Sequence, residues 1–245
     1  MEIIQDVKKG RLHSAYVVGA FDKAKQALES AGYRVILLEE QAGLRVKEGT
    51  DSSISRRGNW TREGFVYVPS KGAFLTKNSP IMANATEATN CHRSGKDFYL
   101  NDEQVEKSLA AAVKIGKTEI PTSRFADEAL TSFAFGKNAK VYGEFLKENG
   151  IDSIRAYFAN SQDKPFARQA WLCRIGGDDK SGLVGGRDLN YGDDEVRGVR
   201  VSDEVAKPSA ENSRVEAYTP KEIQKALESL NLKGLESQIL EALKK

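Results

Sequence analysis

The part of this chain that most constrains its fold is residues 171–200, a segment rich in glycine and poor in apolar residues. Seven of the chain's 21 glycines lie between Gly176 and Gly198, and acids outnumber bases six to three between Cys173 and Glu195. The few apolar residues recur regularly: Trp171, Leu172, Ile175, Leu183, Leu189, Val196 and Val199. This pattern favours short strands joined by Gly–Asp turns over a helix. A few buried residues would then hold a backbone whose other side chains face water.

Composition narrows the class of protein. The chain has 245 residues, 40% hydrophobic and 29% charged, which suits a globular protein of one large domain or two small ones. The net charge of +2 offers no basic field for nucleic acid. Apolar runs such as Val35–Leu38 are too short to cross a bilayer, and no signal peptide follows Met1. We therefore expect no nucleic-acid partner and no membrane insertion. Two cysteines exclude a disulfide framework.

Periodicity predicts several elements in the first hundred residues. A helix is expected over 21–31, with Gly32 as its end. Residues 33–38 suit a strand, but Val35, Leu38, Ala42 and Val46 also fit a helix that ends at Gly49, and both readings stay open. The first fifty residues otherwise read as helical. A strand is expected over 65–68, and 71–93 reads as irregular.

The second half of the chain carries clearer capping signals. Asn101 and Gln104 form a capping box before a helix over 102–115, and a further helix is expected over 138–148. Residues 154–158 alternate like a half-buried strand. We expect one domain over 1–205. Residues 206–245 read as a linker followed by two short amphipathic helices, which pack on that domain or form a homo-oligomer contact.

The sequence carries little that points to catalysis. Cys91 and His92 are adjacent rather than spaced for zinc, and position 111 lacks the glycine that a P-loop ending at Lys117 would need. The acids in 177–179 and 192–194 could bind calcium, although no EF-hand spacing is present. We expect no metal and no cofactor, with calcium as the alternative.

Several blocks of the sequence resemble a known family. The blocks are Pro165–Leu172, Ser181-Gly182-Leu183, Arg187, Leu189 and Arg197-Gly198-Val199-Arg200, with supporting blocks at 58–64, 74–80 and 142–147. Over roughly residues 35–202 the chain resembles the variable proteins of diversity-generating retroelements, in the archaeal and archaeal-virus branch. The resemblance implies an α+β architecture of the C-type lectin type, here with a helical C-terminal extension. It also implies a hypervariable, solvent-exposed surface that binds a ligand.

The resemblance further implies how that surface varies. A reverse transcriptase copies a template with errors at adenines, and the copies replace the variable segment. Asn codons changed at their first two bases reach most amino acids but not Lys, Glu, Gln, Met or Trp. The positions expected to vary, called display positions below, all hold reachable residues: Cys173, Arg174, Gly176, Gly177, Asp178, Asp179, Val184, Gly185, Gly186, Asp188, Asn190, Tyr191, Gly192, Asp193 and Asp194. Lys180 and Glu195 are unreachable and read as frame or as differently encoded positions.

A surface that accepts many side chains must not depend on them for folding, because stability is a small surplus of about 5–15 kcal/mol. The packing is therefore assigned to anchor residues: Trp171, Leu172, Ser181, Gly182, Leu183, Arg187, Leu189, Arg197, Gly198, Val199 and Arg200. With Val196, the apolar anchors are expected to be buried. Arg168, Arg187, Arg197 and Arg200 are expected to fix loops through hydrogen bonds or to lie as plain surface charge.

We predict a receptor-recognition protein rather than an enzyme, whose partner is an unknown protein or surface ligand. Tyr191 and Arg174 are the expected contact residues, and the acids favour a basic partner patch. Without a signal peptide, a virion or cytoplasmic location is expected over secretion. Two alternatives are a relative of the formylglycine-generating oxidases, which share a related fold but need paired cysteines, and an assembly protein that uses the C-terminal helices.

Overall fold

The computed structural model of the chain describes residues 1–7, 12–160, 163–176 and 181–201. The chain divides into two compact units, 1–202 and 203–245, and the linker and helices predicted over 206–245 lie outside the described residues. The strands are β1 Ile4–Val7, β2 Leu12–Val18, β3 Arg34–Val35, β4 Asn59–Val68, β5 Gly72–Thr76, β6 Phe98–Tyr99, β7 Ala112–Lys114, β8 Glu119–Pro121, β9 Ser153–Tyr157, β10 Phe166–Leu172, β11 Leu183–Val184 and β12 Glu195–Val201. The α-helices are α1 Phe21–Ser30, α2 Leu38–Glu48, α3 Ser53–Arg56, α4 Pro80–Ala83, α5 Ala85–Arg93, α6 Asp102–Leu109, α7 Ala129–Phe135 and α8 Ala139–Glu148.

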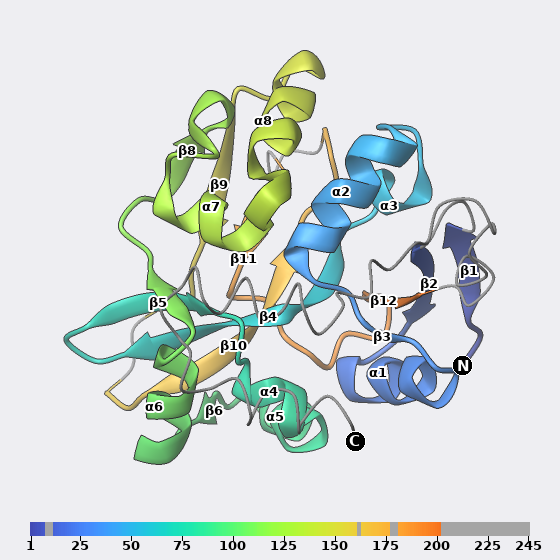
Figure 1. Cartoon of the computed structure of the whole chain (residues 1–245). Coiled ribbons are helices and arrows are strands. Elements are labelled where there is room, and N and C mark those ends of the chain that lie inside the picture. Colours follow the sequence, from blue (N-terminus) through green and yellow to red (C-terminus); the bar gives the residue numbers. More distant parts are fainter. Residues whose placement is uncertain (8–11, 161–162, 177–180, 202–245) are drawn as a thin grey trace, which may run out of the picture. The chain divides into compact units, whose positions relative to one another are not determined.

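The strands form a mixed sheet centred on β4 and β10 (Figure 1). Its main path runs β1-β2-β12-β4-β10-β11-β9-β8, with β3, β5, β6 and β7 paired to the side of this path. Most pairs are antiparallel, but β11 pairs in parallel with β9, and β12 meets β4 in parallel. Of the strands in residues 171–200, β11 therefore lies between β10 and β9, and β12 lies between β2 and β4.

Alternation along β4 gives the sheet two apolar faces. Phe65 and Tyr67 face one cluster, which α2, α7 and α8 cover; Trp60 and Val66 face a second cluster, which α1, α4 and α5 cover. In Figure 1 these two groups of helices lie on opposite sides of β4 and β10. Two covered faces leave the loops at the strand ends as the open parts of the domain.

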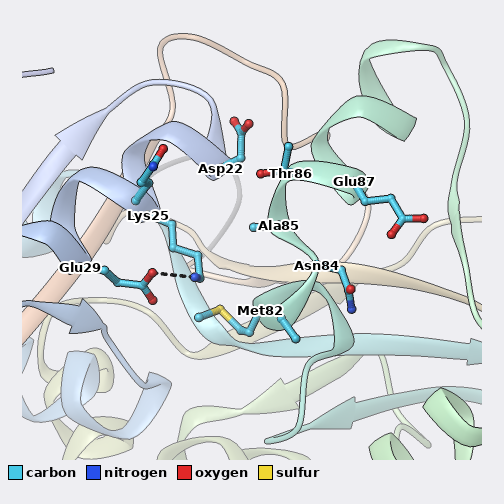
Figure 2. Close-up of a pocket in the computed structure, with 10 residues that line it drawn as sticks. Asp22, Lys25, Glu29, Met82, Asn84, Ala85, Thr86 and Glu87 are labelled. Carbon is cyan, nitrogen blue, oxygen red and sulfur yellow. Dashed lines mark hydrogen bonds and ion pairs between the residues drawn. The ribbon is translucent and has the colours of Figure 1, made fainter.

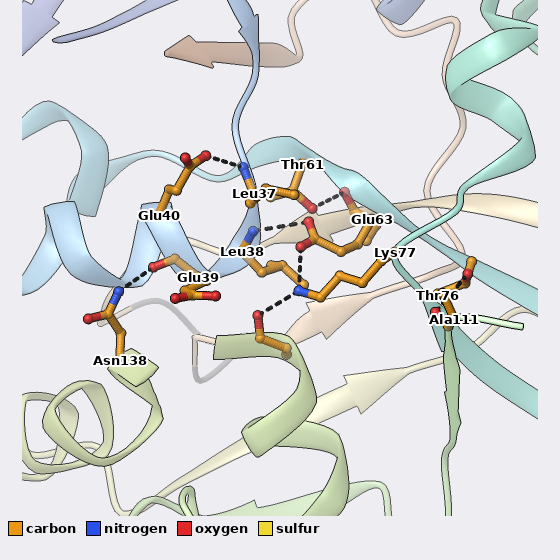
Figure 3. Close-up of polar contacts among 12 residues, drawn as sticks. Leu37, Leu38, Glu39, Glu40, Thr61, Glu63, Thr76, Lys77, Ala111 and Asn138 are labelled. Atoms are coloured by element: carbon orange, nitrogen blue, oxygen red, sulfur yellow. Dashed lines mark hydrogen bonds and ion pairs between the residues drawn. The ribbon is translucent and has the colours of Figure 1, made fainter. Parts of the chain in front are cut away.

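An ion pair between a buried carboxylate and a partly exposed lysine ties α2 and α7 to the sheet (Figure 3). The Glu63 carboxylate is fully buried and accepts hydrogen bonds from the Leu38 amide (3.0 Å) and from Lys77 Nζ (2.8 Å), which also donates to the carbonyl of Ala134 (3.3 Å). Burial raises the pKa of Glu63, and the Lys77 ammonium opposes that shift. The pair therefore positions the start of α2, in line with the preference of a helix N-terminus for negative charge.

The sequence predicted correctly where α6 begins and where α8 ends. Asn101 and Gln104 form the expected capping box of α6, and α8 ends before Gly150, whose φ of +79° favours glycine. Both readings of 33–46 hold in part, because short β3 is followed directly by α2. The 65–68 strand is confirmed as the end of longer β4.

Three sequence predictions were wrong. The first twenty residues form strands β1 and β2 rather than helix, and 71–93 holds β5, α4 and α5 rather than irregular chain. The helix predicted to reach residue 115 stops at Leu109, because the chain then forms β7, in which Val113 pairs with Leu75. Three of the missed strands have a partner that is distant in the sequence, since β2 pairs with β12 and β5 pairs with β7.

Candidate ligand-binding surface

The end of β10, the β9–β11 pair and the loop before β12 surround a hollow of about 370 Å³. The parallel register places Tyr157 opposite Val184, and β10 ends beside them because Trp171 pairs with Val184. The residues that line the hollow are Tyr157, Trp171, Cys173, Val184, Gly186, Arg187, Asp188 and Tyr191. Five of these are display positions and two are anchor residues, so the structure brings much of the predicted site together.

The loop between β11 and β12 is fixed to the N-terminal part of the domain through its backbone. The side chain of Leu189 is fully buried, its amide donates to Nδ1 of His92 (3.0 Å), and its carbonyl accepts from the Phe21 amide (2.9 Å). The carbonyl of Asp194 accepts from the Gly19 amide (2.8 Å). One apolar side chain and three main-chain groups thus hold the loop without using Tyr191 or Asp193.

His92 contributes to this support as a neutral acceptor. The ring is buried, and burial together with the Arg168 charge lowers its pKa to about 4. Its Nδ1 therefore accepts the Leu189 hydrogen bond over a wide range of pH. His92 sits at the end of α5, an element that the sequence did not predict, and the adjacent Cys91–His92 pair gave no sign of this role.

Arg187 lies at the centre of the hollow. Its guanidinium carbon is 4.6 Å from the centroid of the Trp171 ring and 5.4 Å from that of Tyr191. Its Nε donates to Asp194 Oδ2 (2.7 Å), and its Nη2 donates to Oδ1 of the same carboxylate. Burial raises the pKa of Asp194 above its ordinary value, and Arg187 opposes this shift only in part. The hydrogen bond to Asp194 raises the pKa of Arg187. The fork fixes the plane of the guanidinium between the two rings.

Two more arginines of the predicted frame hold loops through acids. Arg168 donates to Asp97 (2.8 Å) and to Asp188 Oδ1 (2.6 Å). Arg197 is fully buried and donates to Asp6, to Ser14 (3.0 Å) and to Glu195 (2.7 Å). Arg200 is instead exposed and lies over the Tyr33 ring at 4.8 Å. The hydrogen-bonding prediction therefore holds for Arg168, Arg187 and Arg197, and Arg200 is a surface charge.

Most anchor residues are buried, as the sequence predicted. Leu172, Ser181, Gly182, Leu183, Leu189, Arg197, Gly198 and Val199 are buried, as is Val196. Gly198 is confined by its neighbours, because a Cβ there would lie 2.9 Å from Cβ of Tyr33 and 3.3 Å from the carbonyl of Arg34. Trp171 and Arg187 are only partly buried. These two anchors therefore also form part of the accessible surface.

The display positions that the structure describes are either accessible to solvent, fully or in part, or buried. Arg174, Gly176, Gly186, Tyr191, Gly192 and Asp193 are exposed, and Val184, Asp188 and Asn190 are partly exposed. Tyr191 exposes 47% of its surface. Gly177, Asp178 and Asp179 lie outside the described residues.

Three display positions are buried, which corrects the prediction that they face solvent. Cys173 is 3% exposed and continues β10 into the core, where its amide bonds to the Gly182 carbonyl (2.9 Å). Gly185 lies against Tyr67 Oη and the Phe65 ring, which a Cβ would approach to 2.5 and 2.7 Å. Asp194 is 2% exposed because it binds Arg187. These three residues therefore pack inside the domain instead of facing solvent.

Tyr157 lines the hollow but was not predicted from the sequence as a site residue. Its neighbours Ile154 and Ala156 are buried on the alternating strand β9, which signals that Tyr157 points the other way. Only the parallel pairing with β11 brings it to Val184, and that pairing has no local sequence signal. Trp171 and Arg187 were assigned to the frame alone, although both line the hollow.

Residues 1–7, 12–160, 163–176 and 181–201 contain no group of three or more His, Cys, Asp or Glu that could hold a metal. Asp188 and Asp194 bind arginines instead, while Asp178 and Asp179 fall outside those ranges, so the calcium alternative stays a prediction. In the same ranges, no helix has the length and apolar character needed to span a bilayer. Cys91 and Cys173 are not joined in a disulfide.

A second hollow, of about 300 Å³, lies between α1 and the α4–α5 pair (Figure 2). Its surface is polar, with Lys25 bound to Glu29 at 2.8 Å and with Asp22 and Thr86 facing each other across the helices. Among the described residues that line it, none is a display position or an anchor residue.

Comparison with known proteins places the fold. No protein-family model and no curated protein sequence matches the chain. A solved structure from Nanoarchaeota, described as showing how the C-type lectin fold accommodates massive sequence variation, superposes with a TM-score of 0.57. The two chains share 14% sequence identity, over 80% of this chain and 100% of the other. The chain therefore has a C-type lectin fold, within the α+β class expected from its sequence.

Proposed function

We propose that this chain is a ligand-binding protein whose hollow and its rim form a variable recognition surface. One observation carries the proposal: four exposed or partly exposed display positions line one hollow, whereas most of the anchors interleaved with them in the sequence are buried. Val184, Gly186, Asp188 and Tyr191 line the hollow, and Leu183 and Leu189 between them are fully buried. Surface substitutions away from special features usually change stability by about 0.5 kcal/mol or less, so such a rim can change while the fold persists.

The corrected display positions sharpen the proposal. The positions free to vary are Arg174, Val184, Gly186, Asn190, Tyr191, Gly192 and Asp193, together with Asp188 when Arg168 keeps its bond to Asp97. Gly176 is also exposed, but its φ of +75° favours glycine. The solved structure with the same fold is described in terms of massive sequence variation, which supports the same reading for this chain. In this copy Tyr191 and Arg174 are the proposed contact residues, with a protein or surface ligand as partner.

We further propose that the variation arises from adenine-specific mutagenic copying, and the neighbouring DNA tests this. We expect a reverse-transcriptase gene nearby and a template repeat that matches codons 171–200 except at adenines. Differences should fall on codons for exposed positions such as Tyr191 and Asp193. They should be missing from the codons for Gly185, Leu189 and Asp194. A repeat that varies the Leu189 codon, or the lack of any repeat, would contradict the proposal.

A further inference from the structure

We infer that Arg187 and Trp171 form a constant floor of the hollow, and that Arg187 donates hydrogen bonds to a main-chain carbonyl of a protein ligand. The inference rests on the proposed function and adds the class of ligand group that the site recognises. Both residues belong to the predicted frame, yet both line the hollow. The ligand would thus meet the same floor whatever residues the rim carries.

The position of Arg187 leaves one edge of its guanidinium available. Nε and Nη2 are occupied by Asp194, while Nη1 has no hydrogen-bond partner in the described part of the chain. The side chain is 37% exposed, and the Asp194 carboxylate and the Trp171 ring hold it in place, with the Tyr191 ring as a further contact in this copy. The Nη1 group is therefore fixed in direction before a ligand arrives, which lowers the entropy lost on binding.

The floor beneath Arg187 is held in place by packing. The rings of Trp171 and Trp60 meet edge to face at 5.1 Å, and Gly58 leaves the space that the Trp171 ring fills. A Cβ at Gly58 would lie 2.6 Å from Cζ2 of Trp171. None of these contacts involves a rim residue, so changes at the rim leave Trp171 in the same position.

Charge around the hollow favours a neutral acceptor over an anion. The carboxylates that interact with Arg187 or Arg168 are Asp97, Asp188, Asp193 and Asp194. These four acids outweigh the two guanidinium groups, so a ligand carboxylate would meet net repulsion. A peptide carbonyl accepts the same hydrogen bonds without carrying charge.

In this copy a second polar group of the hollow can accept a hydrogen bond from a ligand. Oδ1 of Asp188 accepts from Arg168, while Oδ2 has no partner in the residues described, and the side chain is 41% exposed. Oδ2 can accept the N–H of a peptide whose carbonyl binds Arg187. A donor and an acceptor in one hollow suit a peptide backbone, which every protein ligand offers, whereas the rim selects among side chains.

Random twelve-residue peptides displayed on phage provide the probe. Binders are selected on the full chain and on a second chain whose rim carries Asn190→Ser, Tyr191→Phe and Asp193→Asn. We expect the two selections to yield different sequences, each of which binds about tenfold more weakly or worse to Arg187→Lys, since hydrogen bonds to charged groups are worth about 1.5–3 kcal/mol. Arg93→Lys, a change at an exposed arginine on α5, is the matched control and should leave binding unchanged.

A double-mutant cycle separates contact from support. Replacing one peptide amide by an ester weakens its carbonyl as a hydrogen-bond acceptor. The ester that most reduces affinity for the parent chain should have little further effect on affinity for Arg187→Lys. The ester-containing peptides are measured first against the parent chain, so this measurement does not depend on whether any variant folds. Additive effects, failure to select peptides, or selection only of glycans from an array would overturn the inference. None of these results bears on the template repeat, which tests the proposed function separately.

Discussion

Adjacent glycines Gly185 and Gly186 provide the sharpest comparison of frame with display. A Cβ at Gly185 would lie 2.5 Å from Tyr67 Oη and 2.7–2.8 Å from carbons of the Phe65 ring, whereas at Gly186 the nearest atoms are 3.7 Å away. Neither glycine has a positive φ, so backbone strain does not separate the two positions. We expect Gly185→Ala to cost about 1–3 kcal/mol, as overpacking of a dense core does, and Gly186→Ala to change stability by about 0.5 kcal/mol or less.

Thermal unfolding followed by circular dichroism tests this pair. For a domain of this size 1 kcal/mol shifts Tm by roughly 2–4 °C, so Gly185→Ala should lower Tm by about 2–12 °C while Gly186→Ala leaves it nearly unchanged. Serine at each position should reproduce the difference, because its Cβ occupies the same point. Equal effects at the two glycines, or a larger loss at Gly186, would refute the assignment of one to the frame and the other to the display.

Three further predictions concern the loop before β12. Leu189→Ala should destabilise the chain by about 2–5 kcal/mol, because its side chain is fully buried, whereas Tyr191→Ala should cost under about 1 kcal/mol; chemical denaturation of both variants shows whether the losses differ. Asp194→Ala should cost about 1–3 kcal/mol and Asp193→Ala almost nothing, because only Asp194 is buried against Arg187, and similar denaturation midpoints would contradict this. His92 has a pKa of about 4 when folded against about 6.5 when unfolded, so the unfolded state binds the proton first as pH falls. The contribution of His92 to the free energy of unfolding is complete above pH 6.5 and declines towards pH 4, by about 3 kcal/mol in all. The variant His92→Gln should not show this decline. Parallel plots of unfolding free energy against pH for the variant and the parent would contradict the prediction.

Local sequence signals found the elements whose stabilising groups are close together in the chain. The capping box of Asn101 and Gln104 lies within one helical turn, and five of the seven apolar residues singled out in 171–200 are buried. Strand β2 gave no such signal, because residues 14–17 are all buried and do not alternate. Strand β7 depends on β5, which lies more than thirty residues earlier.

The site could be located from the sequence but not resolved residue by residue. Asp193 and Asp194 are chemically identical neighbours, and only the position of Arg187 makes one buried and the other exposed. Gly185 and Gly186 differ only in the presence of Phe65 and Tyr67 from another strand. Tyr157 joins the hollow through parallel pairing across 27 residues. Such distinctions arise from tertiary contacts, which no local pattern encodes.

The most direct measurement is a saturation scan of every position in 171–200, scored by protease resistance of the displayed chain. We expect most substitutions to keep protease resistance at Arg174, Val184, Gly186, Asn190, Tyr191, Gly192 and Asp193. We expect most substitutions to abolish protease resistance at Leu172, Leu183, Gly185, Leu189, Asp194, Val196 and Gly198. Uniform sensitivity along the segment, or free substitution at Leu189 together with sensitivity at Tyr191, would contradict this prediction.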